Sequence, residues 1–357
     1  MAESLRGHLS EPSNAVAKNF LVPPPRQQTA AFINALKTII TENKIDLLIP
    51  ACEEVYYVSM GRAQLPCKVF VEPIEKLNPI HNKWTFLLKA IEYDLSVPET
   101  IFIANQDDLL HAFAQWRGLV IKKIYSRCAS RTLILPTLKQ ALSTLTYESP
   151  WIAQSYMEGT QICTYSVVHS GHITAHTAYR SDFTAGEGAP IAFQHIDHHA
   201  TFNWVKTFVE ADQFTGQIAF DFMVTPDGQV FALECNPRAT SGVHLLASSP
   251  GFAESFINSS QACVMPSECG ADMLSSAMLI YGLPASIMNG EFTNWLSTFI
   301  ASHDVIYNIK DKKPFFLQFR SIFAYLRLAQ RENISALEAT TFDIEWNGEA
   351  KTTPRAK

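Results

Sequence analysis

Hydrophobic positions recur at helical spacing in the first part of the chain and alternate with polar positions further on. From Thr29 to Asn43 they return every three or four residues, which predicts an amphipathic helix. The apolar run at 45–50 is short and predicts a buried strand. A helix followed by a buried strand indicates an α/β unit with a parallel sheet.

The same patterns predict the elements that follow. Helices are expected over 82–93, 106–116, 137–145 and 202–211, and strands over 67–71, 97–103, 119–124, 132–135, 151–156, 162–169 and 172–179. The turn signal Ser170-Gly171 separates the last two strands, and the glycine-rich stretch 181–189 predicts a flexible loop. Residues 263–357 are expected to form apolar helices, such as 315–329, and a short strand near 341–346.

Two further strands, 218–224 and 230–235, flank Asp227-Gly228, which is a strong hairpin signal. If these two residues form the turn, Asp221 faces Glu234, and a one-residue bulge would leave the two acids neighbours. Alternation places Asn236 on the same face. The opposite face is expected to pack inward with Phe220, Phe222, Val224, Phe231, Leu233 and Cys235.

This hairpin face predicts a cation site. Two opposed acidic residues have Cβ atoms about 5 Å apart, and their like charges destabilise the pair. Three oxygen-bearing side chains on one face favour a hard cation such as Mg²⁺. Magnesium held by few carboxylates usually also binds phosphate, for which the guanidinium of Arg238 is suited. A solvated hairpin with a polar outer face is the alternative.

Lysine residues supply candidate phosphate ligands. Lys122 and Lys123 end an apolar strand pattern, and one of them should point inward beside the polar loop 126–130. Lys83 lies near a helix N-terminus, where a cation is unfavourable unless an anion is present. Solvent-exposed lysines are the alternative at these positions.

Two other segments have open interpretations. The connection 154–161 could line an adenine site, or it could be a plain link between strands with polar surface residues. The spacing of His195, His198 and His199 could place two imidazoles on one helical face to bind a metal. No third soft ligand is close to them in the sequence, and isolated histidine pairs are common at protein surfaces.

Composition narrows the class of protein. The 357 residues are 47% hydrophobic and 17% charged, as in globular proteins of two or three packed units. A net charge of −6 gives no basic signature for nucleic acid. Seven scattered cysteines favour reduced thiols, and no signal sequence or membrane span is visible. We therefore expect a cytoplasmic protein that binds neither nucleic acid nor membrane.

The order of the motifs resembles the ATP-grasp superfamily, in the branch related to carbamoyl-phosphate synthetase and biotin carboxylase. It runs through Asn82-Lys83, Val97–Thr100, Ile121–Lys123, 154–161 and Asp221 with Glu234–Arg238. The resemblance implies an α/β and α+β protein in which two α+β subdomains clasp ATP. The expected divisions are a partial Rossmann-like region 1–96 lacking one βα unit, subdomains 97–152 and 153–262, and a mostly helical extension 263–357.

The resemblance also implies roles for individual residues. Asp221, Glu234 and Asn236 match magnesium ligands, for two ions in most relatives, and Mn²⁺ stays an alternative. Lys83 and Lys122 match phosphate-binding lysines, with Lys123 as the alternative to Lys122. Arg238 matches a contact to phosphate, and Arg180 is a candidate for binding the substrate carboxylate. The residues implied for adenosine binding are Gln154, Tyr156, Met157, Glu158 and Gln161.

The implied reaction joins a small-molecule carboxylate to an amine or another nucleophile. The carboxylate attacks the γ-phosphate of ATP, and the nucleophile then displaces phosphate from the acyl phosphate. Such an intermediate needs a lid that excludes water, for which the segments 126–130 and 181–189 are candidates. A kinase or carboxylase of the same fold, and a nucleotide-binding protein without catalysis, stay open, as does a homodimer.

Overall fold

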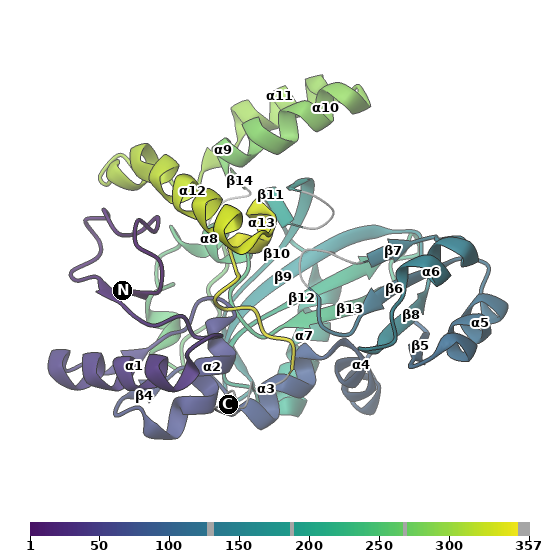
Figure 1. The fold of residues 1–357 in the computed structure, drawn as a ribbon, viewed down its shortest axis with the longest axis horizontal. Coiled ribbons are helices and arrows are strands. Elements are labelled where there is room, and N and C mark those ends of the chain that lie inside the picture. Colours follow the sequence, from purple (N-terminus) through teal and green to yellow (C-terminus); the bar gives the residue numbers. More distant parts are fainter. Residues whose placement is uncertain (127–131, 186–188, 267–269, 349–357) are drawn as a thin grey trace. The chain divides into compact units, whose positions relative to one another are not determined.

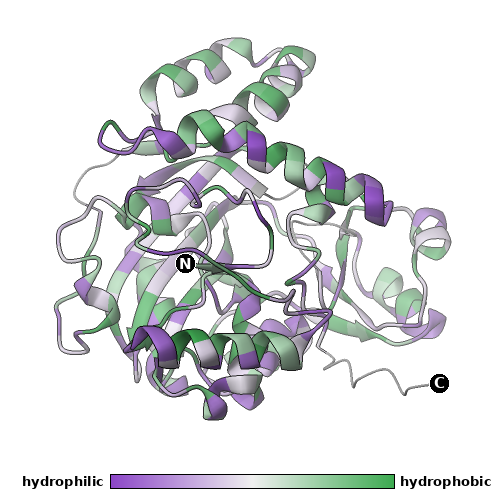
Figure 2. Cartoon of the chain, turned by 60° about the vertical axis from the view of Figure 1, so that its left-hand side comes forward, coloured by the Kyte–Doolittle hydropathy of each residue, from purple (hydrophilic) through white to green (hydrophobic). Residues whose placement is uncertain are grey.

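The computed structural model describes residues 1–126, 132–185, 189–266 and 270–348. The chain forms two compact units, one made of Met1–Ile74 with Asp304–Lys357 and the other of Glu75–His303 (Figure 1). Hydrophobic and hydrophilic residues are interspersed along the helices (Figure 2). Within the described ranges, no helix has both the length and the apolar character that crossing a membrane requires.

The second unit contains a seven-stranded sheet, called the large sheet below. Its order is β13 (Val230–Asn236), β12 (Gly216–Val224), β9 (Thr160–His169), β10 (His172–Ala185), β11 (Ala189–Ile196), β14 (Ala271–Met273) and β15 (His303–Asp304). Neighbouring strands from β13 to β14 are antiparallel. Ser170 and Gly171, with φ of 45° and 82°, form the predicted turn between β9 and β10.

Aromatic side chains pack one face of the large sheet against two helices, α7 (His199–Asp212) and α4 (Lys83–Glu92). Trp204 of α7 lies 5.2 Å from both Phe220 and Phe222 of β12, measured between ring centroids. Phe86 of α4 lies 6.0 Å from Phe220. This face is therefore a packed core, as predicted for Phe220 and Phe222.

The same unit contains a four-stranded sheet, the small sheet below. Its order is β5 (Thr100–Ile103), β8 (Trp151–Ser155), β6 (Leu119–Lys123) and β7 (Thr132–Ile134), with antiparallel pairing (Figure 1). One face packs in a hydrophobic core with α5 (Gln106–Gln115) and α6 (Leu138–Thr144). These elements confirm the predicted helices and strands of this region to within a few residues.

Shorter elements complete the unit. They are α3 (Ile74–His81), α8 (Gly242–Leu246), η2 (Glu254–Phe256), α9 (Ser275–Ala277), the π-helix η3 (Met278–Gly282), α10 (Leu283–Asn289) and α11 (Phe292–Ala301). Helix α8 approaches the large sheet so closely that a Cβ atom on Gly242 would lie 2.6 Å from the Cβ atom of Tyr165. Glycine is required at this contact.

The prediction of a flexible loop over 181–189 is wrong. Strand β10 continues to Ala185 and β11 begins at Ala189, while residues 186–188 lie outside the described residues. Phe183 and Ala185 are buried in a cluster with Trp295 of α11. Burial against a distant helix therefore extends the strand through a stretch whose composition predicts a loop. The second lid candidate, 126–130, lies outside the described residues except for Ser126.

The first unit is a small α/β arrangement built from both ends of the chain. Strands β3 (Leu47–Leu48) and β4 (Lys68–Val69) pair in parallel, and β1 (Ala2–Glu3) pairs in parallel with β2 (Phe20–Leu21). The β3–β4 pair confirms the predicted parallel α/β unit, with strands of only two residues each. The helices of this unit are α1 (Thr29–Asn43), as predicted, α2 (Glu54–Gly61), η1 (Arg62–Gln64), α12 (Lys313–Glu332) and α13 (Ala336–Ala339).

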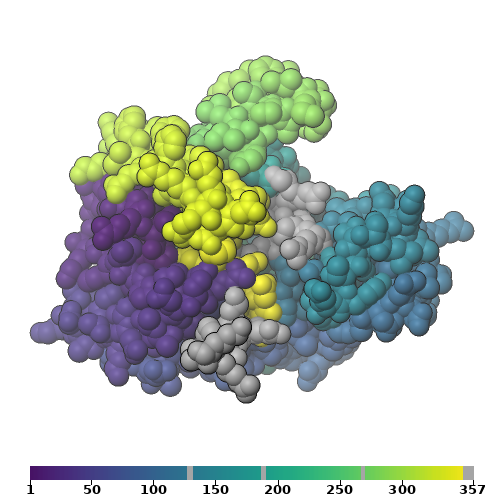
Figure 3. Space-filling model, in the orientation of Figure 1, coloured from purple at the N-terminus to yellow at the C-terminus, as the bar shows by residue number. Residues whose placement is uncertain are grey.

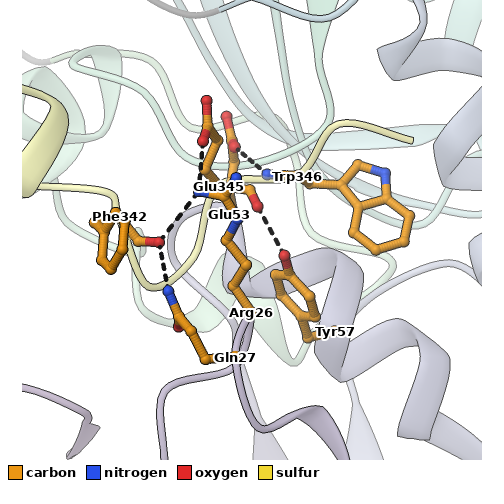
Figure 4. Close-up of polar contacts among 7 residues, drawn as sticks. All are labelled: Arg26, Gln27, Glu53, Tyr57, Phe342, Glu345 and Trp346. Carbon is orange, nitrogen blue, oxygen red and sulfur yellow. Dashed lines mark hydrogen bonds and ion pairs between the residues drawn. The ribbon is translucent and has the colours of Figure 1, made fainter. Parts of the chain in front are cut away.

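The prediction of a strand near 341–346 is wrong. This segment forms turns, and the N-terminal part of the unit hydrogen-bonds to it. The backbone N–H of Arg26 donates to the carbonyl of Asp343 at 2.8 Å. The Gln27 amide donates to the Phe342 carbonyl at 3.0 Å, and the Tyr57 hydroxyl donates to the Glu345 carbonyl at 2.7 Å (Figure 4). Its carbonyls thus find donors on a loop and a helix instead of a neighbouring strand.

Trp346 anchors this segment. Its ring is 4% exposed, stacks on Tyr56 at 5.6 Å and meets the edge of Tyr57 at 5.4 Å. Its backbone N–H donates to the buried carboxylate of Glu53 at 3.1 Å (Figure 4). In Figure 3 the yellow C-terminal atoms of this unit lie against its purple N-terminal atoms. The C-terminal segment is therefore part of the core of this unit.

We expect Trp346→Ala to lower the free energy of unfolding by roughly 3–5 kcal/mol, because it empties an aromatic site in a packed core. Phe316→Ala removes a ring that is 64% exposed in the same unit, and it should change stability by about 0.5 kcal/mol or less. Urea unfolding followed by circular dichroism compares the two variants. Equal losses would show that Trp346 does not anchor the C-terminal segment.

Candidate functional site

The hairpin of β12 and β13 brings two carboxylates together at its centre. Asp221 pairs with Glu234, as predicted, and the register then shifts so that Phe222 pairs with Ala232. The bulge leaves Ala232 fully buried and Leu233 only half-buried. The prediction that Phe231 and Leu233 pack inward is therefore wrong, because the bulge reverses the alternation beyond the two acids.

The face that carries Asp221 and Glu234 continues across the large sheet. Asp221 is opposite Cys163 of β9, which is opposite Tyr179 of β10. Directly opposed residues share a face, so these side chains form one row on the side away from α7. The Cys163 thiol hydrogen-bonds to Asp221, and the Tyr179 hydroxyl lies 3.3 Å from the hydroxyl of Thr240.

Lys83 reaches this row from the first turn of α4. Its Nζ lies 3.0 Å from Glu234 Oε2 and donates to the carbonyl of Ser126 at 3.2 Å. The residue is 4% exposed. Asn82 caps the helix by accepting hydrogen bonds from the backbone N–H groups of Trp84 and Thr85, which holds Lys83 in the first turn. The carboxylate of Glu234 thus offsets the unfavourable position of a cation at a helix N-terminus.

Lys122 and Lys123 point to opposite faces of the small sheet. Burial lowers the pKa of Lys122 to about 8, although Glu234 opposes this shift and Lys83 adds to it. The Nζ of Lys123 instead lies 5.2 Å from the ring centroid of Trp151, on the core side of the small sheet. Lys122 is therefore the lysine that the structure brings to Glu234.

The pKa values of Asp221 and Glu234 are shifted in opposite directions. Burial, and then the charge of Glu234, raise the pKa of Asp221 to about 7. Burial would also raise the pKa of Glu234, but the ammonium groups of Lys83 and Lys122 outweigh it and lower that pKa well below its usual range. A proton on Asp221 relieves the repulsion within this carboxylate pair, and a cation between the two groups would relieve it as well.

Asn236 and Arg238 complete the cluster. The Asn236 amide donates to Glu234 at 3.4 Å, and its Oδ1 accepts from the Arg238 guanidinium at 3.1 Å. In the described part of the chain, no three His, Cys, Asp or Glu side chains are grouped as a metal site. The hairpin offers two carboxylates and an amide oxygen. This set fits magnesium, which commonly takes one or two carboxylates and completes its shell with phosphate and water.

The residues predicted to bind adenosine lie close to these two faces. Gln154 of β8 is 2% exposed and donates to the Thr100 hydroxyl at 3.3 Å. It pairs with Val120, so it shares a face of the small sheet with Lys122. Gln161 of β9 is exposed and, by alternation, shares the face of Cys163 and Asp221.

The connection between β8 and β9 holds the other three predicted adenosine residues. The backbone N–H of Tyr156 donates to the carbonyl of Gly118 at 3.0 Å, and its ring is 39% exposed. Met157 is half-buried and Glu158 is exposed. The segment thus keeps polar and apolar groups accessible next to the faces that carry Lys122 and Gln161.

Two predicted groups lie elsewhere. Arg180 pairs with Gln194, so it points to the face opposite Tyr179 and lines a separate cavity of about 230 Å³. The structure does not bring it to the carboxylate pair. The alternative of two imidazoles on one helical face is wrong. His195 lies on β11, where its Nδ1 is 2.9 Å from the Thr177 hydroxyl, while His198 caps α7.

Cys163 and Tyr179 are neighbours of the carboxylates that no motif in the sequence predicts. The alternating pattern of 162–169 and 172–179 places each on one face of its strand. Strands β9 and β10 form a hairpin across the predicted turn, but the pairing of β9 with β12 that brings Cys163 and Tyr179 to Asp221 is long-range. No local signal reports it.

No protein-family model matches the sequence, and no curated protein matches it. Solved structures with a similar fold include N5-carboxyaminoimidazole synthetase from Staphylococcus aureus complexed with ADP, at a TM-score of 0.62 and 11% identity, over 81% of this chain and 78% of that one. Carboxyaminoimidazole ribonucleotide synthase from Aspergillus clavatus complexed with ATP matches at 0.56 and 11%, over 70% and 69%. L-amino acid ligase from Bacillus licheniformis matches at 0.53 and 13%, over 68% and 62%. The chain therefore has the ATP-grasp fold.

We expect Lys83→Met to lower the free energy of unfolding by about 3 kcal/mol, because it leaves the half-buried Glu234 carboxylate without its closest cation. Lys206→Met is the matched control, since its ion pair with Glu210 joins two side chains that are each 54% exposed. The control should cost less than about 1 kcal/mol. Denaturant unfolding at pH 7 compares them, and a similar loss in both variants would contradict a stabilising ion pair between the buried Lys83 and Glu234.

Proposed function

We propose that this chain is an ATP- and magnesium-dependent ligase that joins a carboxylate to an amine or another nucleophile through an acyl phosphate. The observation that carries the proposal is the convergence of Lys83 and Lys122 on Glu234 of the Asp221–Glu234 pair, with Arg238 linked to Glu234 through Asn236. The fold supports it, because ATP-grasp structures include an L-amino acid ligase and synthetases crystallised with ATP or ADP.

Lys83 and Lys122 would bind the phosphates of ATP. Both ammonium groups interact with the Glu234 carboxylate, so the site concentrates positive charge next to one acid. In the ATP complex the two ammonium groups would bind phosphate oxygens. Phosphoryl transfer needs positioning and charge neutralisation more than a side-chain nucleophile. Gln154 and the connection from Tyr156 to Gln161 would hold the adenosine between the two sheets.

Asp221, Glu234 and Asn236 would hold one or two magnesium ions, with Mn²⁺ as a substitute. Magnesium bound there supplies charge neutralisation for the phosphate oxygens. The Cys163 thiol hydrogen-bonds to Asp221 and thereby holds that carboxylate in place. Arg238 is fixed through Asn236, which ties a phosphate-binding guanidinium to a metal ligand on the same strand end.

The acyl phosphate requires exclusion of water. We assign residues 97–152 and 153–262 to the two halves that clasp the nucleotide, and small-molecule carboxylates and amines to the substrates. Among the cysteines of the described part, Cys67, Cys163, Cys235 and Cys263 are free thiols. Reduced thiols suit the cytoplasm, where we place the protein.

Glu234→Gln should abolish measurable Mg-ATP binding, because it removes the carboxylate that Lys83, Lys122 and Asn236 share. Isothermal titration calorimetry with and without Mg²⁺ measures this. Glu210→Gln changes an exposed acid on α7 in the same way, and it should leave the affinity within about twofold, equivalent to a few tenths of a kcal/mol. Unmodified protein without affinity for Mg-ATP would refute the proposal.

Lys122→Met and Lys123→Met form a second matched pair of neighbouring substitutions. The first should weaken ATP binding at least about tenfold, equivalent to 1.4 kcal/mol, because it removes a phosphate ligand. The second removes a cation from the ring of Trp151, so it should leave the affinity nearly unchanged. The reverse result would mean that the register of β6 in the complex differs from the structure.

Product analysis separates a ligase from other ATP-grasp activities. Incubation with Mg-ATP, a panel of carboxylates that includes amino acids, and a panel of amines should yield ADP, phosphate and an amide, detected by mass spectrometry. A stable phosphorylated product would indicate a kinase, and a bicarbonate-dependent product a carboxylase. ATP binding without turnover on any panel member would support a nucleotide-binding module.

A further inference from the structure

A second cavity, of about 240 Å³, lies on the face of the large sheet opposite the carboxylate pair. His176 of β10, Phe202 of α7, Cys263 and Met265 are among the residues that line it. His176 and Tyr179 lie three positions apart on β10 and therefore point to opposite faces. The cavity is thus separate from the site proposed for ATP.

His176 has a buried nitrogen without a partner. The residue is 1% exposed, and its Nδ1 lies 2.9 Å from the Ser166 hydroxyl. Its Nε2 is buried and has no hydrogen-bond partner among the described residues. Burial, and then the charge of His195, lower the pKa of His176 to about 3, so the ring is neutral at working pH. A buried polar atom of this kind is rare without a ligand or water.

Two sulfur atoms share the face of His176. Val264 forms a parallel bridge with Ala175, and the backbone N–H of His176 donates to its carbonyl at 2.9 Å. Alternation about this bridge turns Cys263 and Met265 to the side where His176 lies. The Cys263 Sγ lies 3.9 Å from the Met265 Sδ.

We propose that His176, Cys263 and Met265 form a binding site for a soft monovalent metal ion of the Cu(I) class. Thiolate and thioether sulfur together with imidazole are the donors that favour Cu(I). Metal–sulfur bonds of about 2.3 Å in a trigonal site put the ligand atoms about 4 Å apart. The two sulfur atoms already have this separation.

The surroundings also suit a metal. A histidine ligand usually donates its second N–H to an acceptor, which fixes the ring and its tautomer. The Ser166 hydroxyl can accept from Nδ1 and leave the lone pair of Nε2 free. Phe202 packs edge-on against the ring at 4.9 Å. Met265 is 39% exposed, so it provides an entry for the ion, while His176 is at the buried end.

The binding step is an exchange of a proton for the metal. Burial raises the pKa of the Cys263 thiol to about 11, so the thiol is protonated without metal. Cu⁺ would form a bond to Cys263 sulfur while the S–H bond breaks and its proton leaves to solvent, with no change in oxidation state. Zn²⁺ fits less well, since it takes four N, S or O ligands and rarely uses a thioether.

Anaerobic titration of the full-length protein with Cu(I) against a chromophoric chelator tests the site. We expect one ion per chain to bind more tightly than any others, and X-ray absorption to show two sulfur ligands and one nitrogen ligand. Loss of a residue that only orients a metal ligand lowers metal affinity roughly 10–100-fold. Cys263→Ser and Met265→Leu each remove a ligand itself, so each should lower the affinity by at least this factor.

Matched controls are Cys67→Ser, a half-buried thiol of the other unit, and Met288→Leu, which changes a methionine that is 85% exposed. Both should keep the affinity of the unmodified protein, and thermal unfolding should show that every variant is folded. Equal affinities in folded Met265→Leu, Cys263→Ser and the controls would overturn the site. Absence of a one-to-one complex in the unmodified protein would overturn it too.

Discussion

The pairing of Asp221 with Glu234 on one half-buried hairpin face is the constraint on which the second unit depends. Two carboxylates so placed cannot both stay charged without cations close by. Lys83 comes from α4 and Lys122 from the small sheet, so one electrostatic requirement joins two separate elements to the hairpin. The folded unit therefore brings two lysine ammonium groups and two carboxylates together at one place.

Local interactions explain which parts of this arrangement could be predicted. The Asp227-Gly228 signal predicts the hairpin, which makes Asp221 and Glu234 neighbours on adjacent strands, although their direct pairing depends on the bulge at Leu233. Helix α1 follows from its apolar spacing alone, within its predicted bounds. These features need no knowledge of distant residues, because the interactions that determine them span only a few positions of the chain.

Long-range packing explains what could not be predicted. The bulge at Leu233 reverses which residues of β13 point inward, and no residue of the strand predicts a bulge there. Residues 181–185 extend β10 because Phe183 is buried with Trp295, more than a hundred positions away. The choice between Lys122 and Lys123 depends on which face of β6 receives α5 and α6. In each case a distant partner decides the environment of a locally ambiguous residue.

Strand β10 shows how one element can serve two kinds of chemistry. Tyr179 faces the row of Cys163 and Asp221, where charge and oxygen ligands dominate. His176 faces the other side, where burial keeps the imidazole neutral and Cys263 and Met265 line the same cavity. A hard cation is favoured on the first face and a soft one on the second. The large sheet between them keeps the two sets of ligands apart, so each ion would find its own donors on its own face.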